Sequence, residues 1–151
     1  MHREGARPLS MSAVDGALVI LTVLFAGRVA AQAVQRWLPV PFLPPFAAFQ
    51  GSNISYAVLL SAQVAILALM VHVVRRVRQR RLEPSKRASR LLTFAGGLYV
   101  AVMLTRLVVG LAVPGAPGWF RSGISIAFHF VLAMFVLMLA AYHRNGAGRV
   151  R

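Results

Sequence analysis

The fold of this chain is decided by residues 54–90, which read ISYAVLLSAQVAILALMVHVVRRVRQRRLEPSKRASR. Residues 54–74 contain no acid, lysine or arginine, and a helix of about 20 apolar residues is long enough to cross the hydrocarbon core of a bilayer. Residues 75–90 then carry eight arginines and lysines against one acid, Glu83. Basic loops beside membrane spans stay in the cytoplasm. The stretch therefore predicts a transmembrane helix that ends in a cytoplasmic basic loop.

Three further apolar segments of similar length accompany this one, at residues 14–37, 91–113 and 124–142. They are apolar nearly all round, which suits lipid exposure better than the one-sided pattern of a soluble helix. Of the 151 residues, 58% are hydrophobic and 13% charged, against about 45–50% and about 25% in a soluble domain. We therefore predict an all-α integral membrane protein, a single domain over residues 1–151, in which four transmembrane helices form a bundle of two hairpins.

The basic residues also predict the orientation. With four spans and a cytoplasmic middle loop, both termini lie in the cytoplasm, and the basic residues of the two tails agree with this. Sixteen of the seventeen basic residues are arginines, a bias of GC-rich bacterial genomes, so we expect a multi-pass protein of the bacterial inner (cytoplasmic) membrane. At about 1 kcal/mol per residue, the middle loop is expected to hold anionic lipid. The residues of this surface are Arg75, Arg76, Arg78, Arg80, Arg81, Lys86, Arg87 and Arg90.

The two outer connections differ from the basic loop. Residues 37–46 and 113–121 contain several prolines, which end helices because proline lacks an N–H and fixes φ. Their aromatic residues suit the interfacial belt of a membrane protein, and the first connection is expected to lie in the interface as a short extended or re-entrant piece.

An alternative for the first span is a secretory signal peptide. Arg3 and Arg7, an apolar run at 17–26 and the small-residue step Ala31-Gln32-Ala33 are typical of one. Cleavage after Ala33 would leave three spans and an outside N-terminus. Arg28, just before that step, and the full spanning length of the segment favour retention.

Two arginines, Arg28 and Arg106, interrupt otherwise apolar spans. A charged side chain is costly in hydrocarbon, so an intramembrane arginine is a functional-site hypothesis by default. Counted at about 1.5 Å per residue, five polar residues fall within about 6–15 Å of the outer boundary, and every span contributes at least one. They are Arg28, Gln32, Gln63, Arg106 and His129.

Helical spacing places Tyr99 on the face of Arg106 and Ser125 on the face of His129. If these faces point inward, they form a cationic pocket open to the outer leaflet, in which arginine suits a phosphate or carboxylate. The chain has three acids, all near the cytoplasmic side, so a ligand would supply the counter-charge. We expect an anionic lipid or a lipid-linked phosphate or carboxylate, bound by Arg28, Gln32, Gln63, Tyr99, Arg106, Ser125 and His129.

Two alternatives remain open for the arginines. Both lie close enough to the interface to snorkel outward, in which case they orient the helices and bind nothing. They also suit an accessory subunit, where they would pair with the acids of a larger membrane complex. A stripe of small residues at Ala57, Ser61 and Ala65 permits close helix approach, inside the chain or in a homo-oligomer.

Other chemistry has little support in the sequence. Cysteine is absent, and the three acids give neither a general acid–base pair nor a metal site with histidine. We expect no catalytic residues, metal or cofactor, and no nucleic-acid partner, because the net charge of +14 gathers at helix ends. A membrane-bound enzyme, or a haem carrier with His72 and His143 as ligands, is the third alternative.

Overall fold

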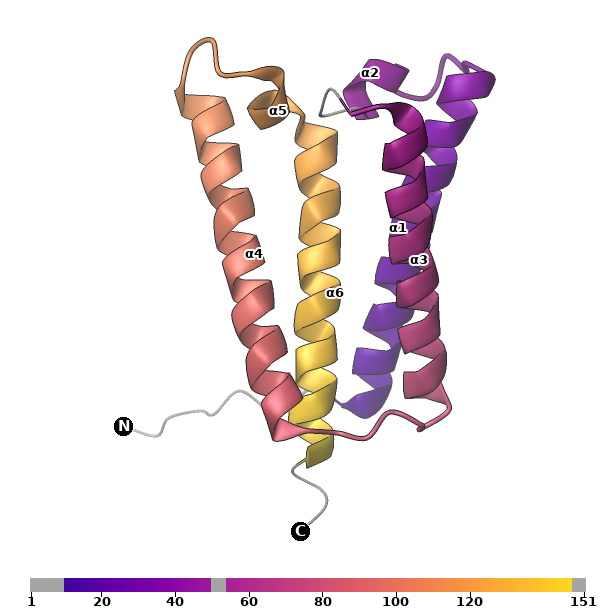
Figure 1. Ribbon diagram of the computed structural model, residues 1–151, viewed down its shortest axis with the longest axis vertical. Coiled ribbons are helices and arrows are strands. Elements are labelled where there is room, and N and C mark those ends of the chain that lie inside the picture. Colours follow the sequence, from indigo (N-terminus) through magenta and orange to yellow (C-terminus); the bar gives the residue numbers. More distant parts are fainter. Residues whose placement is uncertain (1–9, 50–53, 148–151) are drawn as a thin grey trace.

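Four long helices and two short ones make up the part of the chain that the structure, a computed structural model, describes: residues 10–49 and 54–147 (Figure 1). No strand occurs in these two ranges, so the predicted all-helical fold is confirmed. The four long helices are each long and apolar enough to cross a membrane. In chain order the helices are α1 (Met11–Trp37), α2 (Phe46–Phe49), α3 (Tyr56–Arg78), α4 (Lys86–Ala112), α5 (Gly118–Arg121) and α6 (Gly123–Ala147).

The helices continue beyond the predicted spans into the basic residues between α3 and α4. Helix α3 includes Arg75, Arg76 and Arg78, and α4 begins at Lys86, so the connection is only residues 79–85. Basic side chains in the last turn of α3 lie at the negative end of the helix dipole, which favours continuing the helix. The N-cap Ser85 starts α4, its hydroxyl accepting a hydrogen bond from the Ala88 N–H.

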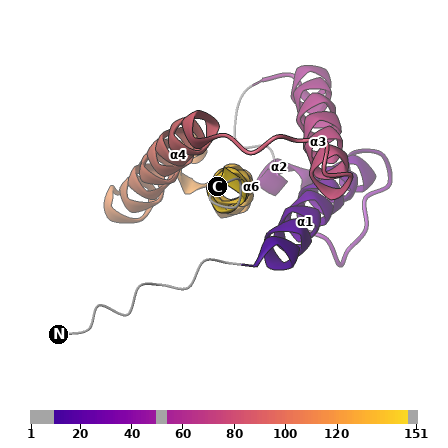
Figure 2. The ribbon, with the colours of Figure 1, turned by 90° about the horizontal axis from the view of Figure 1, so that it is seen from below.

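The long helices form an open row rather than a closed square. Helix α6 lies in the middle, in contact with α4 on one side and α1 on the other, and α3 packs against α1 (Figures 1 and 2). Helices α3 and α4, consecutive in sequence, therefore lie at the two ends of the row. The short helix α2 contacts both α1 and α6 and lies at the same end of the molecule as α5 (Figure 1).

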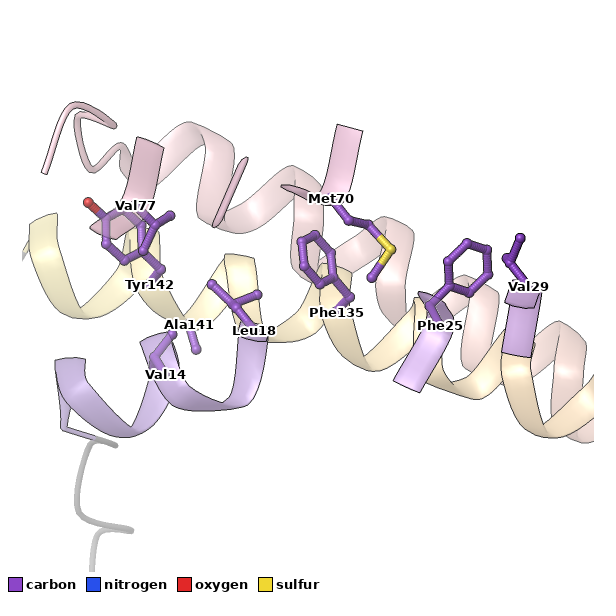
Figure 3. Close-up of a cluster of buried hydrophobic side chains, with 9 residues drawn as sticks. All are labelled: Val14, Leu18, Phe25, Val29, Met70, Val77, Phe135, Ala141 and Tyr142. Atoms are coloured by element: carbon purple, nitrogen blue, oxygen red, sulfur yellow. The ribbon is translucent and has the colours of Figure 1, made fainter. Parts of the chain in front are cut away.

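The apolar core lies where α1, α3 and α6 meet (Figure 3). Large hydrophobic side chains elsewhere on α3 and α4 are exposed, Phe94 and Leu111 by 74% and 80%. Such faces are stable only against an apolar surrounding, as expected for helices in a bilayer. The core residues are Val14, Leu18, Phe25, Val29, Met70, Val77, Phe135, Ala141 and Tyr142.

Candidate functional site

Arg28 lies two turns before the end of α1 and makes two hydrogen bonds inside the protein. Its Nη1 donates to Oε1 of Gln32, one turn later on the same face, at 2.8 Å. Its Nη2 donates to the carbonyl oxygen of Phe49 in α2 at 3.1 Å. Only 8% of the side chain is exposed. The guanidinium group therefore links α1 to the connection that folds back over it.

Gln63 of α3 completes the network across the helices. Its Nε2 donates to the same oxygen, Oε1 of Gln32, at 3.1 Å. Gln32 and Gln63 are 0% and 5% exposed. Hydrogen bonds between side chains on neighbouring spans hold transmembrane helices together, so these three residues position α1 against α3.

A cavity of about 240 Å³ lies beside this network, between α1, α3 and α6. Four of the predicted site residues line it: Arg28, Gln63, Ser125 and His129. The ring of Phe128 lies 5.7 Å from Cζ of Arg28, within reach of a cation–π interaction. The rest of the lining is apolar: Phe25, Phe49, Ile54, Leu59, Ala62, Ile66 and Leu132.

His129 lies between this cavity and α4. Its Nδ1–H donates to the Ser125 carbonyl oxygen at 2.6 Å, one turn earlier in α6. The Tyr99 ring of α4 meets the His129 ring edge to face, with centroids 6.1 Å apart. His129 also lies near enough to both Arg28 and Arg106 to experience their charges. It is thus the residue that joins the two parts of the predicted pocket.

The two predicted residues of α4 do not line the cavity. Helix α4 meets the rest of the chain through α6 and α5, on the side of α6 away from α1 (Figure 2). Arg106 is 2% exposed, buried at this position on α4. The seven predicted residues are therefore split: Arg28, Gln63, Ser125 and His129 around the cavity, Gln32 behind it, and Tyr99 and Arg106 across α6.

The residues that the sequence analysis missed belong to the connection after α1. The Phe49 carbonyl oxygen accepts from Arg28, and the Ala48 carbonyl oxygen accepts from the Ser122 hydroxyl at 3.3 Å. Backbone acceptors carry no signal in a side-chain pattern. The available signal was the pair Pro44-Pro45 before Phe46, which turns the chain back and opens α2.

A second hollow, of about 440 Å³, lies at the opposite end of α3. Nη2 of Arg76 donates to the Arg81 carbonyl oxygen at 3.4 Å, and Arg80 takes the left-handed conformation with φ 52°. The chain thus turns sharply after α3 and brings Arg81 back beside Arg75 and Arg76. The hollow is lined by His72, Arg75, Arg76, Gln79 and Arg81.

The two histidines of the haem alternative have different surroundings. His143 is buried and its Nδ1 accepts a hydrogen bond from the Ser85 N–H at 3.2 Å. His72 is exposed and lines the basic hollow. Within the described ranges, no three His, Asp or Glu side chains gather in a way that could hold a metal ion.

Comparison of the chain with protein-family models, curated proteins and solved structures gives no match.

Proposed function

We propose that this chain is a non-catalytic, multi-pass protein of the bacterial inner membrane that binds an anionic lipid or a lipid-linked phosphate or carboxylate. The binding site is the cavity lined by Arg28, Gln63, Ser125 and His129. Arg106 and Tyr99, across α6, contribute through His129 by charge and by ring contact.

The proposed orientation makes α1–α3 and α4–α6 two hairpins, with both termini in the cytoplasm. Most basic residues of the described ranges lie at the ends of α3 and α6 and at the start of α4, which share one end of the molecule (Figure 1). Basic residues flanking spans stay in the cytoplasm. The opposite end, with α2 and α5, then faces outward, and the cavity lies in the outer half of the membrane.

The observation that carries the proposal is the buried Arg28 guanidinium beside a cavity. Asp15, the acid on the same helix, is thirteen residues away, about 20 Å along the axis, and Glu83 lies in the connection at the cytoplasmic end. A buried charge is stable when it is paired and hydrogen-bonded. An anion in the adjacent cavity would supply that pairing, which Gln32 and the Phe49 carbonyl provide only by hydrogen bonds.

The lining of the cavity supports entry from the bilayer. Ile54 and Ile66 are 50% and 37% exposed although they line it, so the cavity meets the lipid-facing surface along α3. Helix α2, whose Phe49 lines the cavity, lies at the end of the molecule that would face water (Figure 1). A ligand with an apolar tail, which arrives from the bilayer, therefore has a shorter route to the cavity than a water-soluble ligand.

The basic surface at the other end is proposed as a second contact with anionic lipid. Its hollow brings Arg75, Arg76 and Arg81 together with His72 and Gln79, and basic side chains at the cytoplasmic surface attract anionic head groups.

The positions of the arginines favour the accessory-subunit alternative less than they favour lipid binding. Arg28 and Arg106 are buried within the chain itself and do not lie on a surface that faces neighbouring proteins. An acid on a partner helix would have to enter the cavity to reach Arg28, whereas a lipid head group can reach the cavity from the lipid-facing surface.

Native mass spectrometry of the purified protein tests the proposal. We expect the wild type to retain an anionic adduct of defined mass that Arg28→Gln loses. Arg121→Gln is the matched control, because Arg121 is an exposed arginine at the same end of the molecule, and it should retain the adduct. Indistinguishable lipid profiles for all three proteins would refute the anion site.

A further inference from the structure

Arg28 determines which atom donates and which atom accepts in each hydrogen bond of the network beside the cavity. A guanidinium group only donates, so the Gln32 atom 2.8 Å from Nη1 must be the amide oxygen, Oε1. That oxygen also faces Gln63 at 3.1 Å, so the Gln63 atom must be the donor Nε2. The orientations of both side-chain amides therefore follow from one charged group.

This arrangement of donors and acceptors leaves three buried polar atoms without a hydrogen-bond partner: Arg28 Nε, Gln32 Nε2 and Gln63 Oε1. The first two are donors and the third is an acceptor. Buried polar groups are nearly always satisfied in folded proteins, and each exception calls for an explanation. Arg28 and Gln63 line the cavity, so an occupant of the cavity can explain theirs.

Arg28 Nε and Gln63 Oε1 require different hydrogen-bonding partners. Arg28 Nε calls for an acceptor, best a negatively charged one. Gln63 Oε1 calls for a donor, which an ionised carboxylate or a phosphodiester does not have but a hydroxyl does. Both atoms are buried and belong to side chains that line the cavity, so binding requires both side chains to turn towards the occupant. An occupant that satisfies both atoms therefore combines an anion with a hydrogen-bond donor, and beside the Arg28 cation a neutral hydroxyl is a better donor than an ammonium group.

We infer that the ligand is an anionic phospholipid whose head group carries a free hydroxyl, of the glycerol phosphodiester class. The phosphodiester lies at Arg28 and a head-group hydroxyl donates to Gln63 Oε1. The inference rests on the proposed function, and it narrows the ligand from any lipid anion to one that also donates. The apolar lining by Phe25, Leu59 and Leu132 favours a lipid over a soluble glycerol phosphate of the same head-group chemistry.

Two lipids of equal charge test the hydroxyl requirement separately from the anion requirement. The full chain, in nanodiscs of phosphatidylcholine, is titrated with phosphatidylglycerol and with phosphatidylmethanol of the same acyl chains, and binding is measured by native mass spectrometry. Phosphatidylmethanol keeps the phosphodiester and lacks the hydroxyl. Leaving a buried acceptor unsatisfied weakens binding by about 5- to 150-fold, so we expect phosphatidylglycerol to bind at least about fivefold more tightly.

Substitution of the acceptor is the second arm of the experiment. Gln63→Met is close in size and removes Oε1, so the two lipids should bind it with about equal affinity. Val64→Met, at the next residue of α3, which is 52% exposed and does not line the cavity, should keep the wild-type preference. A cooperative thermal unfolding transition shows that Gln63→Met is folded, and a Gln63→Met protein that still prefers phosphatidylglycerol would overturn the role of Oε1.

The remaining outcomes distinguish the inference from the proposed function. Equal binding of both lipids to the wild type, lost in Arg28→Gln, would refute the hydroxyl requirement and leave the anion site standing; a water molecule then satisfies Gln63. Binding that is the same in wild type and Arg28→Gln would refute both. Displacement of phosphatidylglycerol by the soluble phosphodiester glycerophosphoglycerol at similar concentration would show that the source of the head group is not a lipid.

Discussion

Single glycines of α4 decide how closely it approaches its neighbours. A Cβ at Gly96 would lie 2.7 Å from Cδ2 of Leu137, a flexible side chain of α6. A Cβ at Gly110 would instead run into the backbone carbonyl of Phe120 in α5, which cannot turn aside. At Gly97 nothing lies within 4 Å. The three positions share a helix and a residue type, and only their neighbours differ.

Replacement of Gly110 by alanine is therefore expected to destabilise the protein. Overpacking against fixed neighbours costs about 1–3 kcal/mol, and the free energy of unfolding in detergent should fall by that amount. Gly97→Ala is the control in the same helix: with open space at the Cβ and a better helix former, it should be neutral or more stable by up to about 1 kcal/mol. Equal effects of the two substitutions would contradict the close contact between α4 and α5.

At the scale of the element, the connection between α3 and α4 is fastened to α6. The Tyr142 hydroxyl donates to the Leu82 carbonyl oxygen at 2.8 Å, and the Ser85 N–H donates to His143. The Ser89 hydroxyl donates to the Ala140 carbonyl oxygen at 3.0 Å. Three consecutive contacts thus hold a stretch rich in arginine against the last two turns of α6.

Loss of the tyrosine hydroxyl should loosen this connection. In Tyr142→Phe the Leu82 carbonyl loses its partner, which weakens the local structure by about 0.5–1.5 kcal/mol, and the Arg80 and Arg81 bonds become more open to trypsin. We expect cleavage there to accelerate about two- to tenfold, since local opening governs proteolysis. Tyr99→Phe, which keeps the ring that faces His129, should be cleaved at the wild-type rate; acceleration in both would assign the effect to general destabilisation.

The two ends of the whole molecule, taken along the axes of the long helices, differ in charge. Residues 79–85 join α3 to α4 at the basic end, and α2 and α5 form the opposite end (Figure 1). The side of the membrane that each end faces decides whether the cavity lies in the outer or the inner half of the bilayer.

Single cysteines measure this orientation directly, because the chain has none of its own. Phe42 is 82% exposed in the connection before α2, and Arg81 is exposed between α3 and α4. A membrane-impermeant maleimide should label Phe42→Cys in intact spheroplasts and Arg81→Cys only after permeabilisation, as the positive-inside rule predicts. The opposite pattern would place the cavity in the inner half.

The positions of the four long helices follow from the amino-acid sequence alone. Four apolar segments with a single acid, Asp15, and few arginines are long enough to span hydrocarbon, and α1, α3, α4 and α6 correspond to them. The contact of Arg28 with Gln32 can also be predicted from the sequence, because residues i and i+4 share a face of any helix.

The polar residues that meet between helices are known only from how the helices pack in three dimensions. Helices that are apolar nearly all round have no single buried face, so periodicity does not rank the ways to pack them. The observed order, α4–α6–α1–α3, brings Gln63 to Gln32 and leaves Arg106 across α6 from the cavity. Depth follows from counting along one helix, whereas neighbours follow from side-chain packing between helices.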